Sequence, residues 1–205
     1  MNFLNKTPVI LASASPRRKD LLEKSGINLE VVPADIDETS VSCRNPENYV
    51  QKLAFLKAEC VAWSRRDAWV IGADTIVVAG SKILNKPLSR DDAINMLKML
   101  SNCEHSVYTG FCILRHNMNR KVINAVKTRV KFRHLDTNEI LWYVNTGEPF
   151  DKAGGYGIQE RAASFVKAIS GSYSNVVGLP VCEVMEAFAK LNIVQFQEIQ
   201  DHAVC

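Results

Sequence analysis

The feature that most constrains the fold of this chain is a long apolar run at residues 69–78, Trp-Val-Ile-Gly-Ala-Asp-Thr-Ile-Val-Val. Apolar runs of this kind are typical of β-strands that are buried on both faces of a sheet. Asp74 interrupts the run, and a carboxylate in such a place needs a cation, a metal ion or several hydrogen-bond donors to stay ionised. The run therefore predicts a buried strand whose single acid has a partner elsewhere in the chain.

Two interpretations of Asp74 remain open at this stage. Backbone donors at a β-bulge could satisfy the carboxylate, which would make it structural. Alternatively Asp74 is a general base or a metal ligand, and the small residues Gly72 and Ala73 beside it would leave room for a ligand.

A second apolar strand, at residues 9–12, leads into a helix. Ser15 occupies the N-cap position, Pro16 suits the first helical position, and Gly26 is a suitable C-terminal stop. Further strands are expected at residues 29–33, 105–114, 122–134 and 165–169. Further helices are expected from residue 46 to about 65 and at residues 89–100, 138–145 and 180–191, with turns at 82–86 and 171–173 and a peripheral tail after about residue 192.

The start of the first helix carries cations where the helix dipole disfavours them. Arg17, Arg18 and Lys19 crowd its first turn, at a cost of roughly 0.3–1 kcal/mol each. An anion would resolve this conflict, because free N–H groups, the hydroxyls of Ser13 and Ser15 and the two guanidinium groups converge there. The alternative is a capped surface helix with solvated arginines.

The composition of the chain sets bounds on its function. The chain has 205 residues, of which 47% are hydrophobic and 23% charged, and a net charge of +3. Such a balance is ordinary for one globular domain and too weak to indicate a nucleic-acid or membrane partner. The six cysteines have no metal-ligand spacing, so we expect reduced thiols in the cytoplasm. We see no targeting or membrane-spanning segment.

Four more polar residues are candidates for the site, and two of them follow the end of a strand, where an α/β fold places ligand sites. Asp37 and Glu38 form an acidic loop after the expected strand at residues 29–33. Lys57 lies at the edge of the apolar face of its helix, where it either extends to solvent or points inward at an anion. Lys86 follows soon after the central strand. The isolated histidines at positions 105, 116 and 134 are expected to be structural.

A glycine-rich stretch at residues 151–159, Asp-Lys-Ala-Gly-Gly-Tyr-Gly-Ile-Gln, is the third candidate site segment. Gly154 and Gly155 allow close approach of the backbone to a ligand, or positive φ angles. Lys152 and Gln159 flank them with a charge and an amide that could read the edge of a base. Glycine-rich turns are common, so this stretch is weak evidence by itself.

The three segments have complementary chemistry. Cations around phosphates, together with carboxylates that can hold a divalent metal ion and accept a proton, are what phosphoanhydride cleavage requires. Neither a Walker A sequence nor a dinucleotide-binding G-x-G-x-x-G is present.

Several of these motifs resemble the Maf (septum formation inhibitor) family. The resemblance rests on residues 11–18, 36–38, 72–75, 85–87, 100–101, 105–110 and 151–159, in the order of the family, and extends from about residue 9 to 191. It implies an α/β fold shared with inosine triphosphatases: an elongated mixed sheet with flanking helices and two lobes around a cleft. We therefore expect residues 1–205 to form one domain.

The resemblance also implies an activity. Family members are nucleoside triphosphate pyrophosphatases that cut between the α- and β-phosphates, use Mg²⁺ or Mn²⁺ and are usually homodimers. The sequence at residues 151–159 matches the subgroup that acts on dTTP and UTP. The alternatives are a purine or 7-methyl-GTP substrate on the same fold, or a non-catalytic regulator of septum formation.

Residue roles follow from the resemblance position by position. Asp74 would accept the proton, and Glu38 would join it around the metal. Base choice would involve Arg17, Thr75 and Gln159. Phosphate contacts would come from Ser13, Arg18, Lys57, Lys86 and Lys152.

Overall fold

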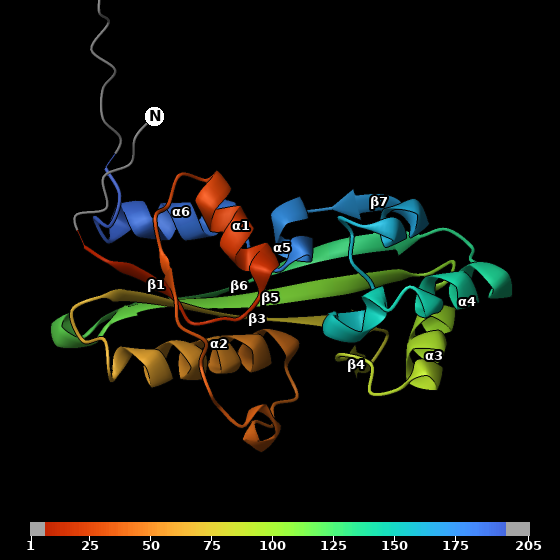
Figure 1. Ribbon diagram of the computed structural model, residues 1–205, viewed down its shortest axis with the longest axis horizontal. Coiled ribbons are helices and arrows are strands. Elements are labelled where there is room, and N and C mark those ends of the chain that lie inside the picture. The colour runs from red at the N-terminus through yellow and green to blue at the C-terminus, as the bar shows by residue number, and fades with distance from the viewer. Residues whose placement is uncertain (1–6, 196–205) are drawn as a thin grey trace, which may run out of the picture.

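The computed structural model describes residues 7–195 (Figure 1). Its strands are β1 (Val9–Leu11), β2 (Glu30–Val31), β3 (Trp69–Ala79), β4 (Lys82–Leu84), β5 (Glu104–Arg115), β6 (Arg120–Phe132) and β7 (Val166–Ser170). Its α-helices are α1 (Pro16–Lys24), α2 (Pro46–Ala62), α3 (Arg90–Leu100), α4 (Thr137–Asn145), α5 (Tyr173–Val177) and α6 (Val181–Lys190). Short 3-10 helices are η1 (Glu38–Ser40), η2 (His116–Met118), η3 (Glu148–Asp151), η4 (Ala153–Gly155) and η5 (Arg161–Phe165).

The strands form one mixed sheet in the order β2-β1-β3-β5-β6-β7, with β4 paired to β3. β1 is parallel to both β2 and β3, whereas the pairs β3–β5, β5–β6 and β6–β7 are antiparallel. The mixed α/β sheet expected from the sequence is confirmed.

Helix α2 covers one face of the sheet at very short range (Figure 1). A Cβ atom added to Gly72 of β3 would lie 2.3 Å from the backbone oxygen of Ala54, and one added to Gly110 of β5 would lie 2.4 Å from that of Val50. Only glycine permits this contact at either position. Gly72 therefore lets α2 pack against the strand that carries Asp74.

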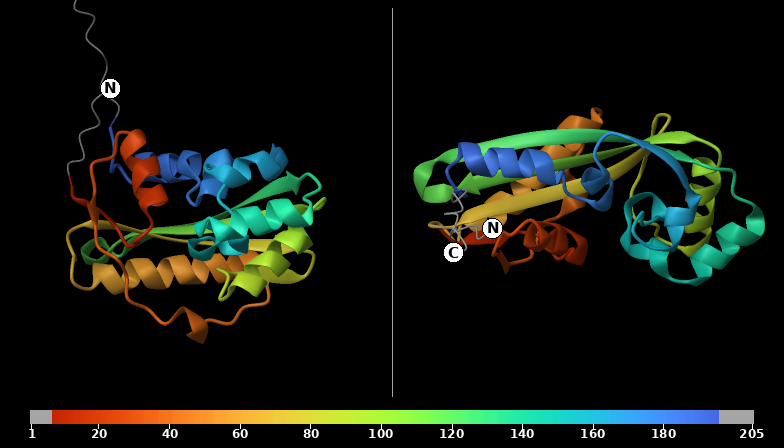
Figure 2. Two further views of the ribbon diagram at one scale, coloured as in Figure 1. Left: turned by 45° about the vertical axis from the view of Figure 1, so that its right-hand side comes forward. Right: turned by 90° about the horizontal axis from the view of Figure 1, so that it is seen from above.

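Helix α6 and the helix pair α3 and α4 lie toward opposite ends of the long strands (Figure 2), and each covers a hydrophobic core. On the face opposite α2, helix α6 packs Val184 and Phe188 against β1, β3 and β5. At the other end, α3, α4 and the aromatic rings of Phe132, Tyr143 and Phe165 form a separate core. We propose on this basis that the chain is one domain with two lobes, joined by a continuous sheet.

One edge of β3 is left open between the two lobes. β1 pairs with residues 69–71 of β3 and β4 pairs with residues 77–79. In the part of the chain that the structure describes, residues 72–76 of β3 have no strand beside them on that edge. The segment after β1 diverges there into helix α1, so the middle of β3, with Asp74 and Thr75, faces an opening.

Most of the expected elements are confirmed to within three residues at each end, with four differences. β2 spans two residues, and β4 occupies part of the expected turn at 82–86. Helix α5 begins at Tyr173, the last residue of the expected turn at 171–173. The chain does not leave the fold after Asn192, because Ile193 and Val194 are buried in the α6 core. The rest of the expected tail, residues 196–205, lies outside the described residues.

None of the described helices combines the length and the apolar character needed to cross a membrane.

Candidate active site

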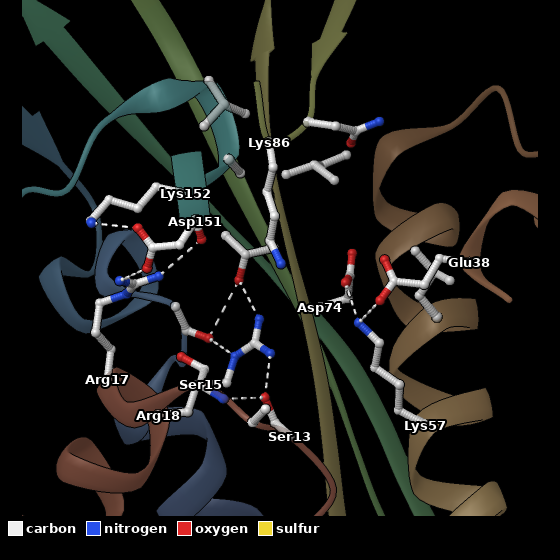
Figure 3. Close-up of a pocket in the computed structure, with 18 of the residues that line it drawn as sticks. Ser13, Ser15, Arg17, Arg18, Glu38, Lys57, Asp74, Lys86, Asp151 and Lys152 are labelled. Carbon is white, nitrogen blue, oxygen red and sulfur yellow. Dashed lines mark hydrogen bonds and ion pairs between the residues drawn. The ribbon is translucent and has the colours of Figure 1, made fainter. Parts of the chain in front are cut away.

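A pocket of about 720 Å³ occupies the opening beside the middle of β3 (Figure 3). This volume is in the usual range for small-molecule sites. The lining comes from the β1–α1 segment, the loop at η1, helix α2, strand β3, the loop after β4, the glycine-rich stretch and the end of α5. The pocket therefore joins the separate segments that the sequence singled out.

The side chain of Arg18, in the first turn of α1, is held by hydrogen bonds to three neutral acceptors. Its Nε donates to the carbonyl oxygen of Gly178 at 2.8 Å, Nη1 to Ser13 Oγ at 3.0 Å and Nη2 to Thr75 Oγ1 at 3.0 Å (Figure 3). Removal of the guanidinium from water lowers the pKa of Arg18, but an arginine stays protonated in a protein. Its positive charge is therefore oriented without an ion pair.

The start of α1 keeps hydrogen-bonding groups available to the pocket. Ser15 is the N-cap residue, as the sequence predicts, but its hydroxyl makes no capping bond. Its N–H donates to Ser13 Oγ at 3.3 Å. The side chain of Arg17 extends across the pocket and forms an ion pair with Asp151, with Nη1 2.7 Å from Oδ2. The first turn of α1 contains no acid, so the positive end of the helix is open to an anion.

An acidic group lies on the other side of β3. Lys57 Nζ is 2.7 Å from Asp74 Oδ1 and 2.8 Å from Glu38 Oε1 (Figure 3). Lys57 therefore points inward, which settles the alternative left open by the sequence. Asp74 is 7% exposed. Burial raises the pKa of Asp74, and the nearby charges of Lys57 and Arg18 oppose that rise.

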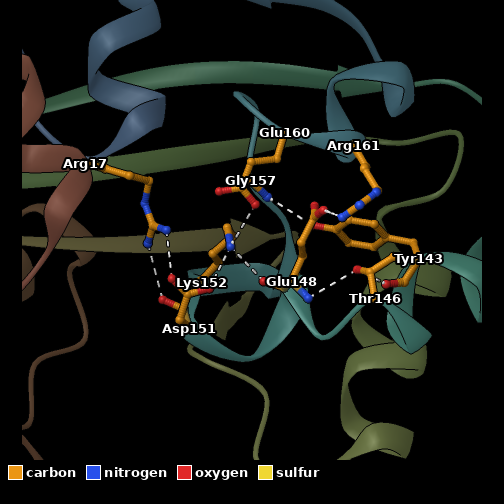
Figure 4. A network of polar contacts seen from close by, with 9 residues as sticks. All are labelled: Arg17, Tyr143, Thr146, Glu148, Asp151, Lys152, Gly157, Glu160 and Arg161. Atoms are coloured by element: carbon orange, nitrogen blue, oxygen red, sulfur yellow. Dashed lines mark hydrogen bonds and ion pairs between the residues drawn. The ribbon is translucent and has the colours of Figure 1, made fainter.

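Lys152 is buried within its own lobe. Its Nζ contacts the carbonyl oxygen of Glu148 at 2.8 Å, Asp151 Oδ1 at 2.6 Å and Glu160 Oε2 at 3.1 Å (Figure 4). Burial alone would raise the pKa of Asp151, but hydrogen bonds from Lys152 and Arg17 outweigh burial and lower it. Lys152 itself lines the pocket, and its charge is shared between Asp151, which also lines the pocket, and Glu160, which does not.

Lys86 and Gln159 differ in their placement. Lys86 lines the pocket and forms neither an ion pair nor a hydrogen bond with any of residues 7–195 (Figure 3). The positive charge of Lys86 is therefore available to an anion in the pocket. The side chain of Gln159 is exposed, and residue 159 is not among those that line the pocket.

The two adjacent glycines serve packing rather than the pocket. Gly154 and Gly155 have φ angles of 69° and 71°, so the positive-φ alternative is confirmed. A Cβ atom at Gly154 would lie 2.9 Å from Val77 Cγ2, and one at Gly155 would lie 3.3 Å from Pro87 Cγ. Neither glycine lines the pocket.

Two contributors to the pocket, Tyr49 and Gly178, and one ion pair, between Arg17 and Asp151, escaped sequence reasoning. Tyr49 of α2 lines it, and its pKa is raised by burial and by the charges of Asp74 and Glu38. Asp151 is the partner of Arg17, 134 residues away in sequence. Gly178 acts through a backbone carbonyl, which leaves no signal in a sequence. The aromatic position 49, next to Val50 on the buried face of α2, is the one signal that could have been used.

A pocket that sets fixed cations beside a pair of carboxylates defines the class of protein: one that binds a phosphorylated small molecule and can act on a phosphoanhydride. The family follows from comparison. The family model described as Maf-like protein matches residues 8–191, and the chain belongs to the Maf family.

Several relatives are similar over almost their whole length. The dTTP/UTP pyrophosphatase of Geotalea uraniireducens is 49% identical over 190 residues, which cover 93% of this chain and 98% of that protein. The dTTP/UTP pyrophosphatase of a Geobacillus species is 48% identical over 183 residues, covering 89% and 97%. The solved structure of the Staphylococcus aureus Ham1 protein matches with a TM-score of 0.49 and 13% identity, over 90% of this chain and 99% of that one.

Proposed function

We propose that this chain is a nucleoside triphosphate pyrophosphatase that hydrolyses dTTP and UTP to the monophosphate and pyrophosphate. Relatives at 43–49% identity carry the name dTTP/UTP pyrophosphatase. The observation that carries the proposal is the pocket itself, in which Arg18, whose charge has no acidic partner, and the carboxylate of Asp74 lie on opposite faces of strand β3. A polyphosphate chain could contact Arg18 while Asp74 accepts a proton from a water molecule.

The proton acceptor we propose is Asp74. Lys57 occupies its Oδ1, and its Oδ2 makes no hydrogen bond to any described residue. Oδ2 can therefore take a proton from an attacking water, and its raised pKa makes that transfer more favourable than for an ordinary carboxylate. Arg18, Lys86 and the open N-terminal turn of α1 would bind the phosphates and orient the α-phosphate toward that water.

The carboxylates of Glu38 and Asp74 fit a divalent metal ion. Both already converge on one cation, Lys57, so the site is built to hold positive charge. Among residues 7–195 no group of three or more His, Cys, Asp or Glu could hold a metal. Two carboxylates completed by water and phosphate oxygens are the donor set that Mg²⁺ and Mn²⁺ accept. When bound, such an ion would neutralise charge on the phosphates.

A panel assay tests the proposal. The purified chain would be incubated with Mg²⁺ or Mn²⁺ and each standard or 5-modified nucleoside triphosphate, and pyrophosphate and orthophosphate would be measured separately. We expect pyrophosphate release mainly from dTTP and UTP. Hydrolysis mainly of purine triphosphates or 7-methyl-GTP would assign a different substrate class to an enzyme of the same fold. No turnover by folded protein would favour a binding regulator of septum formation.

Two further proposals concern the setting of the enzyme. We expect a homodimer, which sedimentation or light scattering would measure directly. We expect a cytoplasmic location, because five of the six cysteines, all those within the described residues, are free thiols. Removal of dTTP, UTP or modified pyrimidine triphosphates before polymerases use them would be a fitting cellular role.

A further inference from the structure

A series of hydrogen-bonded hydroxyl groups leads from Arg18 through the half-buried Thr75 to the fully buried Thr109. Thr75 Oγ1 accepts a hydrogen bond from Arg18 Nη2 at 3.0 Å and lies 3.0 Å from Thr109 Oγ1. Thr109 is fully buried, and its hydroxyl donates to the carbonyl oxygen of Asn175 at 3.0 Å. A hydroxyl has one proton to donate. Because Thr109 gives its proton to Asn175, the bond between the two threonines must be donated by Thr75.

The direction of every bond in this series is therefore fixed. Arg18 donates to Thr75, Thr75 to Thr109, and Thr109 to the backbone of α5. If either hydroxyl turned around, at least one hydrogen bond of this series would break.

The far end of the series is anchored by Asn175, whose side chain is 0% exposed. Its Nδ2 donates to the carbonyl oxygen of Val107 on β5 at 3.2 Å and to Thr128 Oγ1 on β6 at 3.0 Å. These bonds tie the five-residue helix α5 to two strands. Gly178, the C-cap of α5, supplies the carbonyl oxygen that accepts Arg18 Nε. Asn175 thus supports two of the three acceptors that orient Arg18.

We infer that Thr109 and Asn175 are positioning residues for the phosphate-binding guanidinium of Arg18. The inference rests on the proposed function for the identity of the bound phosphate, but the geometry concerns Arg18 alone. Three of the five N–H groups of the guanidinium are used by Ser13, Thr75 and Gly178, and two remain for an anion. None of the three acceptors is an acid, so the orientation of Arg18 depends on their exact placement.

Loss of the Thr109 hydroxyl has a specific consequence. Thr75 would lose its acceptor, and the alternative acceptor within reach is the carbonyl oxygen of Gly178, 3.4 Å away. Thr75 would then be drawn toward the carbonyl oxygen that also accepts Arg18 Nε, so the placement of two of the three acceptors of Arg18 would change. The guanidinium of Arg18 would keep its charge but would no longer be held in one orientation.

The test compares Thr109→Val with Thr109→Ser. Valine has the shape of threonine without the hydroxyl, and serine keeps the hydroxyl. We expect Thr109→Val to weaken binding of inorganic pyrophosphate and to raise the KM for dTTP by about 3- to 10-fold, the value of one hydrogen bond. kcat should change less than KM, and Thr109→Ser should restore most of the affinity.

Thr146→Val is the matched control. The Thr146 hydroxyl also links two backbone groups, donating to Tyr143 and accepting from Glu148, but it has no contact with Arg18. We expect it to leave pyrophosphate affinity within about 2-fold of the parent, because substitutions outside a network usually act independently. An equal loss in both variants would assign Thr109 a general packing role and overturn the inference.

A double-mutant cycle with Arg18→Ala separates positioning from stability. If Thr109 acts through Arg18, Thr109→Val should have almost no further effect on pyrophosphate affinity in the Arg18→Ala background. Additive losses would overturn the inference. The Arg18 Nε–H signal in a ¹H–¹⁵N spectrum, identified by its loss in Arg18→Ala, should be sharp in the parent and broadened in Thr109→Val but not in Thr109→Ser.

Asn175→Ala is a second variant for the same inference. We expect it to broaden the Arg18 signal and to lower the melting temperature, because it leaves buried partners unsatisfied. The spectrum and pyrophosphate binding require no turnover. If the protein did not hydrolyse dTTP, the proposed function would be wrong. The spectrum and pyrophosphate binding would still decide the role of Thr109. An unchanged Arg18 signal in Thr109→Val would overturn that role whatever the substrate.

Discussion

The two faces of strand β3 present opposite kinds of charge to one pocket. Asp74 and Thr75 are adjacent, and successive residues of a strand point to opposite faces. On the α2 face, Asp74 and Glu38 surround Lys57 and leave one net negative charge. On the α1 face, Thr75, Ser13 and Gly178 surround Arg18 and leave one net positive charge.

The difference lies in the partners of the two cations. Lys57 is held by acids, so its charge is compensated and the face as a whole attracts cations. Arg18 is held by neutral oxygens, so its charge remains available while its direction is fixed. An anion and a divalent cation could therefore bind side by side in one pocket, each on the face whose charge complements its own.

Removal of the acid on the α2 face should give the largest effect. Asp74→Asn keeps the shape of the side chain but cannot accept the proton, and we expect turnover of dTTP to fall by about 10²- to 10⁴-fold. Nucleotide binding should stay near that of the parent, because Arg18 is untouched. Asp91→Asn, an exposed acid in α3, is the control. Parent-like turnover in Asp74→Asn would exclude Asp74 as the base.

Removal of the cation on the α1 face should mainly affect binding. Arg18→Ala deletes hydrogen bonds to a charged group, and we expect a rise in KM and a loss of pyrophosphate affinity of roughly 10- to 100-fold. Arg17→Ala is the comparison, because Arg17 is already paired with Asp151. If Arg17→Ala weakened pyrophosphate binding as strongly as Arg18→Ala, an acidic partner would not reduce the contribution of a cation to anion binding, and the comparison drawn here between paired and unpaired cations would be wrong.

The pH dependence of turnover tests the coupling on the α2 face. Lys57 opposes the burial that raises the pKa of Asp74. Lys57→Met removes this opposition, so Asp74 should stay protonated to a higher pH and the acidic limb of the pH–rate profile should move up by about one unit. A limb that stays in place or moves to lower pH would mean that Asp74 does not set it. The same profile measured for Lys57→Arg should show a smaller shift.

The smallest effect is expected for Gln159. Its side chain is exposed and outside the pocket lining, so Gln159→Ala should change the ratio of kcat/KM for dTTP and dGTP by less than about 3-fold, the range of a weak contact. The rate with dTTP should be unchanged. A much larger loss of discrimination would support the base-reading role that the family resemblance gives this residue, and would require the glycine-rich stretch to move on binding.

The pattern of apolar residues alone determined much of this protein. It gave the central strand and the isolated acid at position 74 that needed a partner, and the placement of the charged residues added the cationic first turn of α1. These features follow from local rules, since burial periodicity and helix capping act over a few residues. Agreement of the motifs with one family then placed them in a single pocket.

The partners of the charged groups were decided only by the tertiary structure. Lys152 is an ordinary candidate for phosphate binding in the sequence, yet three acceptors of its own lobe surround it. Arg18 depends on a carbonyl oxygen 160 residues away and on the buried hydroxyl of Thr109. A carbonyl oxygen is the same in every residue, so no side-chain pattern marks the one that Arg18 contacts. Which cation is compensated and which is free is therefore fixed by long-range packing.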